Sequence, residues 1–148
     1  MEINLATTAD IPALSGLLSL LFAQEAEFAP DAAAQQRGLA AIIDEPAVGA
    51  ILVARDGPVV IGMVNLLFTV STALGARVAL LEDMVVAAKA RNRGVGGALL
   101  REAIAYARGQ GCRRITLLTD ADNVRAQAFY RAQGFAMSPM VPLRLALD

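Results

Sequence analysis

The chain has 148 residues, of which 56% are hydrophobic and 18% charged, a balance typical of one compact domain with its own core. It has a single cysteine, Cys112, and no histidine, which excludes an internal disulfide, a Ser-His-Asp or Cys-His nucleophile system and a zinc site with the usual ligands. We therefore expect one domain over residues 1–148, no metal, and a reducing, cytoplasmic setting.

The net charge of −1 conceals an uneven distribution. Residues 1–60 hold eight acids and two bases, whereas residues 61–148 hold eleven bases and six acids, so the two parts are expected to serve partners of opposite charge. A pI near 5.4, without a basic stripe and interleaved aromatics, argues against nucleic acid as a partner. The apolar runs at 11–23 and 59–68 are too short or too interrupted to span a membrane.

The N-terminal part is predicted to form a strand and then two helices. Apolar and polar residues alternate over residues 2–5, as in a strand, and Thr7 and Asp10 have the spacing of a capping box. Leucines at helical spacing give the helix that follows an apolar face. Asp31 is placed to cap a second, alanine-rich helix that extends to Ile43.

The pattern then changes from helical to strand periodicity. An antiparallel meander is expected, with strands over residues 50–55, 59–69 and 77–86. The remaining chain is predicted to form a helix, a strand, a helix and a final strand, over residues 94–108, 113–119, 123–132 and 143–147. Strands on both sides of single crossover helices indicate a mixed, twisted sheet.

Residues 82–100 combine the end of a strand, a basic glycine-rich loop and the start of a helix. The first amides of a helix are unpaired donors, its dipole adds positive potential, and Arg91 and Arg93 add formal charge. This segment predicts a site for a diphosphate, with a plain tight turn as the alternative. The dinucleotide fingerprint fails at Leu99, where it needs glycine, and no P-loop Lys-Ser/Thr follows.

The pattern Arg91-x-x-Gly94-x-Gly96 after an apolar strand resembles the acetyl-CoA signature of the GNAT superfamily of N-acetyltransferases. A second block, over residues 123–135, is similar to the Asn, Ala, Phe-Tyr and Gly-Phe pattern of the same family. The order of elements also agrees, so the resemblance covers nearly the whole chain. It implies an α/β (α+β) fold with a mixed, split central sheet of about six to seven strands and about four flanking helices.

The resemblance also implies how acetyl-CoA, the acetyl donor, would bind. The pantetheine arm would enter a split between the strand ending at Val86 and the strand ending near Thr119, while the loop amides would hold the pyrophosphate. Asn123 has an alternative role as a helix N-cap. The positions implied to contact acetyl-CoA are Met84, Val85, Val86, Arg91, Asn92, Arg93, Gly94, Val95, Gly96, Gly97, Ala98, Asn123, Ala126 and Phe129.

Acetyl transfer to an amine needs a neutral nucleophile, and a primary amine resembles lysine, whose pKa is about 10.4, so a base is useful. Glu82 and Asp83 are candidates for that base. They are adjacent on a strand, so we expect their side chains to point to opposite faces and only one to reach the substrate. The resemblance implies that Tyr130 is the general acid for the CoA thiolate; a core aromatic is the alternative.

In this family the first two helices and the loop between them wall the acceptor site, which implies Glu25, Glu27 and Phe28 as substrate-binding residues. An acidic, partly aromatic wall suits a cationic amine, such as a polyamine, an amino sugar or a peptide amine; a solvated loop is the alternative. We therefore expect an N-acetyltransferase that acts on a primary amine by direct attack in a ternary complex. The alternatives are transfer of a longer acyl group and a catalytically silent acyl-CoA sensor or scaffold. Homodimers are common in the family, and the C-terminal strand is the contact we expect.

Overall fold

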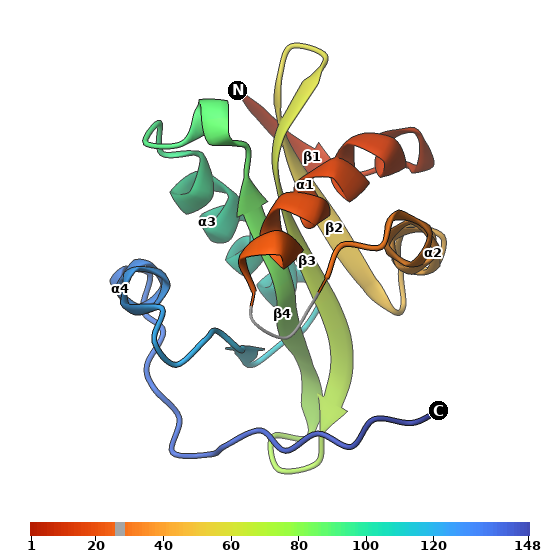
Figure 1. Cartoon of the computed structure of the whole chain (residues 1–148). Coiled ribbons are helices and arrows are strands. Elements are labelled where there is room, and N and C mark those ends of the chain that lie inside the picture. Colours follow the sequence, from red (N-terminus) through yellow and green to blue (C-terminus); the bar gives the residue numbers. More distant parts are fainter. Residues whose placement is uncertain (26–28) are drawn as a thin grey trace.

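The computed structural model describes residues 1–25 and 29–148 and contains a mixed β-sheet with helices on both faces (Figure 1). The strands are β1 (Glu2–Leu5), β2 (Gly49–Asp56), β3 (Val59–Ser71), β4 (Ala76–Val86) and β5 (Ile115–Leu117). The α-helices are α1 (Ile11–Gln24), α2 (Ala32–Ile43), α3 (Val95–Gly109) and α4 (Val124–Ala132). Two 3-10 turns, η1 (Thr8–Asp10) and η2 (Ala88–Ala90), precede α1 and the loop before α3. The predicted helices and the meander are confirmed.

The sheet has the order β1-β2-β3-β4-β5, in which β4 and β5 are parallel and the other neighbours antiparallel. β5 pairs only with residues 79–81 of β4. Residues 82–86, at the carboxyl end of β4, therefore have β3 on one side and none of the described strands on the other. This confirms the mixed, split sheet, although the described residues form five strands rather than six to seven.

The alternation of side chains along the central strand β3 divides the core into two layers. Met63 packs with α1 and α2 on one face, whereas Val64 and Leu66 pack with α3 on the other (Figure 1). α3 lies very close to the sheet at Gly62, where a Cβ atom would be 2.9 Å from Leu99 Cδ1. This contact fixes the position of α3 and of the loop that begins it.

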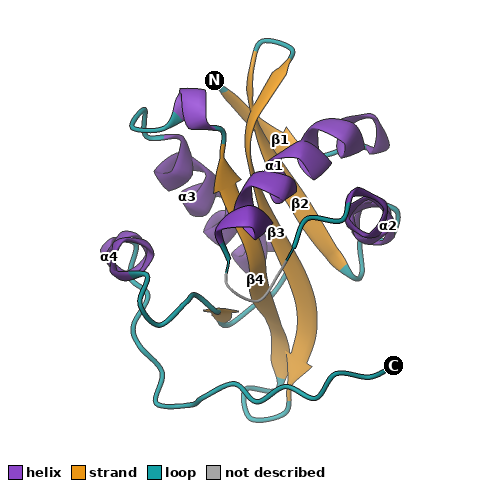
Figure 2. Cartoon of the chain, in the orientation of Figure 1, coloured by secondary structure: helices purple, strands orange, loops and turns teal. Residues whose placement is uncertain are grey.

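The predicted strand over residues 143–147 is wrong. The segment after α4 has no helix or strand as far as the C-terminal residue (Figure 2). The side chains of Leu143, Leu145 and Leu147 are 94%, 84% and 88% exposed. Alternating apolar residues favour a strand only where a sheet edge pairs with it, and this segment pairs with none of the described strands. None of the helices described here is long and apolar enough to cross a membrane.

Candidate active site

The loop between β4 and α3 presents backbone N–H donors near the carboxyl end of β4. Asn92 and Gly94 have positive φ angles of 63° and 76°, which turn the chain from η2 into the helix. The amide of Ala98 donates to the carbonyl of Gly94 at 3.1 Å, and none of the described side chains caps the N-terminus of α3. The amides of residues 95–97 come before that first helical bond, so they are available to an anion.

Two arginines of the loop reach neighbouring oxygens. Arg91 Nε donates to the carbonyl of Val86 at 3.4 Å, and an Arg93 guanidinium nitrogen lies 3.3 Å from Asp56 Oδ2 at the β2–β3 turn. The side chains of Arg93 and Asp56 are 52% and 55% exposed. Because exposed ion pairs are weak, either arginine can turn toward a bound anion at little cost.

α4 meets the start of α3 beside the end of β4. A Cβ atom on Gly96 would lie 3.5 Å from Phe129 Cζ and 3.7 Å from Val86 Cγ2. The structure therefore brings together three positions that the resemblance assigned to acetyl-CoA. Asn123 caps α4 by accepting a 3.1 Å hydrogen bond from the amide of Ala126, which confirms its alternative role. A second role of Asn123 in binding a ligand stays a prediction.

Tyr130 lies in an aromatic cluster on the inner side of α4. Its ring makes edge contacts with Phe129 and Phe135, with centroid distances of 5.1 and 5.7 Å. Its hydroxyl makes no hydrogen bond with any described residue. Burial raises the pKa of the Tyr130 hydroxyl to about 12, so it keeps its proton at neutral pH and can donate it to a hydrogen bond.

The two carboxylates of β4 lie on a β-bulge. Asn65 of β3 pairs with Asp83, and the next residue, Leu66, pairs with Leu81, so Glu82 is the extra residue. Glu82 and Asp83 both line one cavity. The expectation of opposite faces, with only one carboxylate at the site, is therefore wrong, because a bulge breaks the strict alternation of a strand and re-aims its side chains.

Asp83 is held by Asn65, whose Nδ2 donates to Asp83 Oδ2 at 3.0 Å. Burial raises the pKa of the Asp83 carboxyl, and the charge of Glu82 raises it further, while the hydrogen bond from Asn65 opposes both effects. Asn65 is itself only 4% exposed, and its Oδ1 has no hydrogen-bond partner among the described residues. A buried oxygen without a partner is unusual in a folded protein.

Glu25, at the end of α1, joins this acidic group. Burial raises the pKa of its carboxyl, as do the charges of Asp83, Asp120 and Glu82, while Arg144 lowers it. The structure thus places Glu25 near the carboxylates of β4, and its role in binding the acceptor stays a prediction. Glu27 and Phe28, the other predicted acceptor residues, lie outside the described residues.

The cavity that the two β4 carboxylates line lies between α1, α2 and the sheet, and we call it the α1–α2 cavity. Its volume is about 310 Å³. It is lined by Leu18, Phe22, Ala29, Asp31, Ala34, Gln35, Gly38, Leu39, Ile42, Asn65, Leu67, Glu82 and Asp83. Sequence reasoning missed Asn65 and the residues of α2. The one signal for Asn65 is that it is the only polar side chain in the apolar run 59–68.

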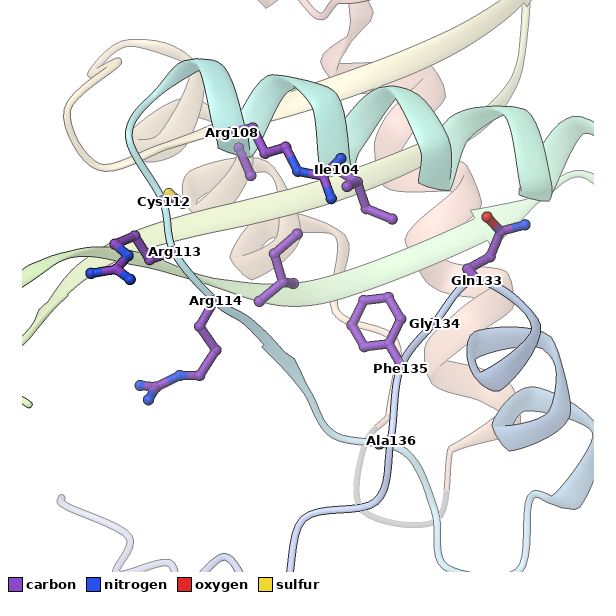
Figure 3. A pocket seen from close by; sticks show the side chains of 11 residues that line it. Ile104, Arg108, Cys112, Arg113, Arg114, Gln133, Gly134, Phe135 and Ala136 are labelled. Atoms are coloured by element: carbon purple, nitrogen blue, oxygen red, sulfur yellow. The ribbon is translucent and has the colours of Figure 1, made fainter. Parts of the chain in front are cut away.

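A second cavity, of about 330 Å³, lies on the opposite face between the end of α3, β5 and the segment after α4 (Figure 3). Arg108, Arg113 and Arg114 approach it from one side, and Phe135 from the other. No carboxylate is among the described residues that line it. It therefore offers neither a base nor a counter-charge for an amine.

Comparison with known proteins agrees with this arrangement. The model of the Acetyltransferase (GNAT) family matches residues 15–135. Over 138 residues the chain is 33% identical to the uncharacterized N-acetyltransferase YhfO of Bacillus subtilis (strain 168), which covers 91% of this chain and 89% of that protein.

Solved structures with the same fold extend the comparison. An integron cassette protein, HFX_CASS3, from the mobile metagenome of Cole Harbour Salt Marsh, has a TM-score of 0.85 and 27% identity, covering 99% of this chain and 90% of that one. A structure described as a probable acetyltransferase has a TM-score of 0.84 and 24% identity, covering 100% of this chain and 99% of that one; at this identity the likeness concerns the fold.

Proposed function

Because the chain belongs to the GNAT family of acetyltransferases, we propose that it is an acetyl-CoA-dependent N-acetyltransferase that acts on a primary amine of a small molecule or peptide. The observation that carries the proposal is the position of Glu82 and Asp83. Both line the α1–α2 cavity and begin the part of β4 that pairs with β3 but has no described strand on its other side. A base and a free sheet edge thus adjoin each other.

The residues around that edge fit acetyl-CoA. The free amides at the start of α3, with Arg91 and Arg93 beside them, would hold the pyrophosphate. The backbone of residues 84–86 would pair with the pantetheine arm as an added strand does. When bound, acetyl-CoA supplies a thioester carbonyl that the amine nitrogen attacks directly, in a ternary complex, with the thiolate leaving.

The protein's own groups would prepare the amine and the leaving group. A primary amine is mostly protonated at neutral pH, so Asp83 or Glu82 would first accept a proton from it, directly or through water. The raised pKa of Asp83 brings that carboxylate closer to neutral pH, where a base works best. Tyr130 would donate a hydrogen bond to the departing sulfur.

A panel of amines, assayed by release of the CoA thiol, tests the proposal. We expect release from acetyl-CoA that depends on both the enzyme and a primary amine. Tight binding of acetyl-CoA without release from any amine would instead support the alternative of a silent acyl-CoA sensor. A comparison of acetyl-CoA with longer acyl-CoA donors in the same assay shows which acyl group the protein transfers.

A further inference from the structure

The α1–α2 cavity has a chemical character that narrows the acceptor. We infer that the acceptor is a primary amine on an apolar body, with the body held between α1 and α2 and the nitrogen at the carboxylates of β4. This inference rests on the proposed function and names the substrate class of the same site.

The walls of the cavity are mostly apolar. α1 contributes Leu18 and Phe22, α2 contributes Leu39 and Ile42, and β3 contributes Leu67. Hydrocarbon surface of this kind stabilises a ligand that brings apolar surface of its own. A volume of about 310 Å³ is at the small end of ligand pockets, so the body is small.

Among the polar groups that line the cavity, only hydrogen-bond acceptors lack a partner among the described residues. The Gln35 amide nitrogen donates to Ser15 and Ser19 of α1, and its oxygen accepts from the amide of Asp31. The carboxylate of Asp31 accepts from the amide of Ala34 as a helix cap. Gln35 thus ties α1 to α2 with both ends of its amide occupied, whereas the second carboxylate oxygen of Asp31 has no hydrogen bond with a described residue.

The other oxygens without a partner lie together at the sheet. Asp83 uses one carboxylate oxygen for Asn65, and its other oxygen has no hydrogen bond with a described residue. The same holds for both carboxylate oxygens of Glu82 and for the buried Oδ1 of Asn65. A ligand that satisfies this end of the cavity must bring N–H donors and positive charge.

Asn65 is the observation that separates this site from a mere group of surface acids. Its side chain is anchored on Asp83, so its orphaned oxygen belongs to the same wall of the cavity. Leaving that oxygen unpaired costs free energy in the free protein. A donor that enters beside Asp83, with a small shift of the covering side chains, recovers part of that cost.

The same reasoning disfavours highly polar acceptors. An amino sugar would place several hydroxyls against the leucine and phenylalanine side chains, and a polyamine would place a second ammonium there unless it reached Asp31 at the start of α2. Those groups would lose their hydration without gaining a partner, which is unfavourable. An amine with one nitrogen and a hydrocarbon chain or ring avoids this cost.

The test compares kcat/KM for hexylamine, spermidine and glucosamine as acetyl acceptors. It uses the wild-type protein and the Gly38→Leu variant. Gly38 lines the cavity, and an added Cβ atom would meet no atom within 4 Å, so a larger side chain can begin there without strain, and a leucine is expected to take up cavity space. Gly16→Leu is the matched control. Gly16 lies in α1, its Cβ would also meet nothing, and it does not line the cavity.

In the wild type we expect kcat/KM for hexylamine to exceed that for either polar amine about tenfold or more. Gly38→Leu should lower the hexylamine value about tenfold, while Gly16→Leu should leave it unchanged. Faster turnover of spermidine or glucosamine, or equal hexylamine activity in both variants, overturns the inference and leaves the proposed function intact.

Binding of hexylamine to the CoA-loaded protein, measured by calorimetry, separates the two claims. If no amine is acetylated but hexylamine binds and Gly38→Leu weakens that binding about tenfold, the proposed function fails, while the part of the inference that concerns which amines the cavity binds stands. If hexylamine neither reacts nor binds, while acetyl-CoA does bind, the inference fails as well. Unchanged acetyl-CoA affinity in both variants verifies that they are folded.

Discussion

At the scale of single residues, the site depends on a contact between two neighbouring strands. Asn65 and Asp83 are register partners on β3 and β4, and their side chains are hydrogen bonded at 3.0 Å. Burial favours the neutral form of Asp83, whereas the hydrogen bond from Asn65 favours the carboxylate. In the proposed mechanism Asn65 would act through Asp83 as a positioning residue and would help to set the pH at which the proposed base becomes available.

This balance predicts the pH dependence of the reaction. A base must be ionised to accept a proton, so kcat/KM should rise with pH through the raised pKa of Asp83. Asn65→Leu keeps the shape of the side chain but removes the hydrogen bond that lowers this pKa, so the rising limb should move to higher pH. Pre-steady-state or initial-rate profiles between pH 5 and pH 9, roughly the range where such shifts appear, measure the displacement.

Met63→Leu is the control for that profile, because Met63 is a buried residue of β3 with no polar contact to the acids. The rising limb of the pH profile of Met63→Leu should coincide with that of the wild type. A limb that stays in place in Asn65→Leu would show that Asp83 is not the group that titrates.

Tyr130 makes a separate prediction about the leaving group. Its pKa of about 12 exceeds the ordinary thiol pKa of about 8.5, so full proton transfer to the thiolate is uphill and a hydrogen bond is the expected contribution. A hydrogen bond to a charged group is worth about 1.5–3 kcal/mol. Tyr130→Phe should therefore lower kcat roughly 10- to 100-fold, with little effect on acetyl-CoA affinity.

Stopped-assay turnover numbers and calorimetry on the same Tyr130→Phe preparation check both parts of this prediction. Phenylalanine keeps the ring contacts with Phe129 and Phe135, so the fold should hold. Full activity would remove Tyr130 from the mechanism and leave it as a core aromatic residue.

At the scale of elements, the loop before α3 combines donors of two kinds. The amides at the helix start are fixed by the backbone, whereas Arg91 and Arg93 are exposed side chains that already contact other oxygens. The amides should therefore supply the larger share of the binding of a pyrophosphate, with the arginines adding to it.

Replacing both Arg91 and Arg93 by alanine should weaken acetyl-CoA binding about tenfold, which corresponds to ~1.4 kcal/mol. The effect should shrink as salt is added, because exposed charges are screened. Calorimetric titrations at low and high salt measure both effects. Arg108→Ala, at the opposite end of α3, is the matched control. Equal affinity in the double variant and the control would contradict the assignment of this loop.

The sequence predicts most elements because each carries its own local signal. The leucines of α1, the cap at Asp31 and the glycine-rich start of α3 are readable in order along the chain, and all three elements form as expected. The bulge at Glu82 has no such signal, since register is decided by pairing between strands. The same limit explains the error at residues 143–147, where the alternation is present but a partner strand is not.

The candidate site was predictable to the extent that it lies on motifs. The loop, Tyr130 and the acids of β4 stand in recognisable patterns. The walls of the α1–α2 cavity do not, because Leu39 and Ile42 have the same periodicity whether they face a core or a ligand. Asn65 acquires its meaning only from the carboxylate opposite to it.

At the scale of the whole molecule, the charge asymmetry between the two parts of the sequence only partly describes the fold. Glu25 comes from the acidic part, but the acids that raise its pKa, Asp83, Asp120 and Glu82, all come from the basic part. Folding therefore assembles an acidic site across the division. The basic loop at Arg91 and Arg93 follows β4 after the short turn η2, so regions of opposite charge lie close together at the carboxyl end of this strand.

Two carboxylates, the buried Asp10 and the half-buried Asp83, act in opposite directions on the stability of the whole molecule. Asp83 has a raised pKa, so its ionised form is a cost to the native state at neutral pH. Asp10 has a lowered pKa, chiefly because the guanidinium of Arg55 donates to it at 2.6 and 2.8 Å, aided by the amide of Thr7. This pair ties η1 to β2 and is mostly buried.

The sign of the Asp10 effect follows from linkage. A carboxyl whose pKa is lower in the native state stabilises it above the unfolded pKa of about 3.9, and that contribution disappears as the pH falls through the native value. Asp10→Asn should therefore lower the free energy of unfolding by about 2 kcal/mol at neutral pH, and the difference should vanish near about pH 2.

Urea unfolding of the wild type and Asp10→Asn at a series of pH values measures that convergence. Glu102→Gln, which neutralises an exposed carboxylate in the middle of α3, should run parallel to the wild type throughout. If the free energies of unfolding of the wild type and Asp10→Asn differ by the same amount down to the lowest pH, the lost stability comes from altered packing or hydrogen bonding and not from the charge of Asp10. Because the pair joins the N-terminal turn to the sheet beneath α1, its loss at acid pH should loosen the face that carries the α1–α2 cavity first.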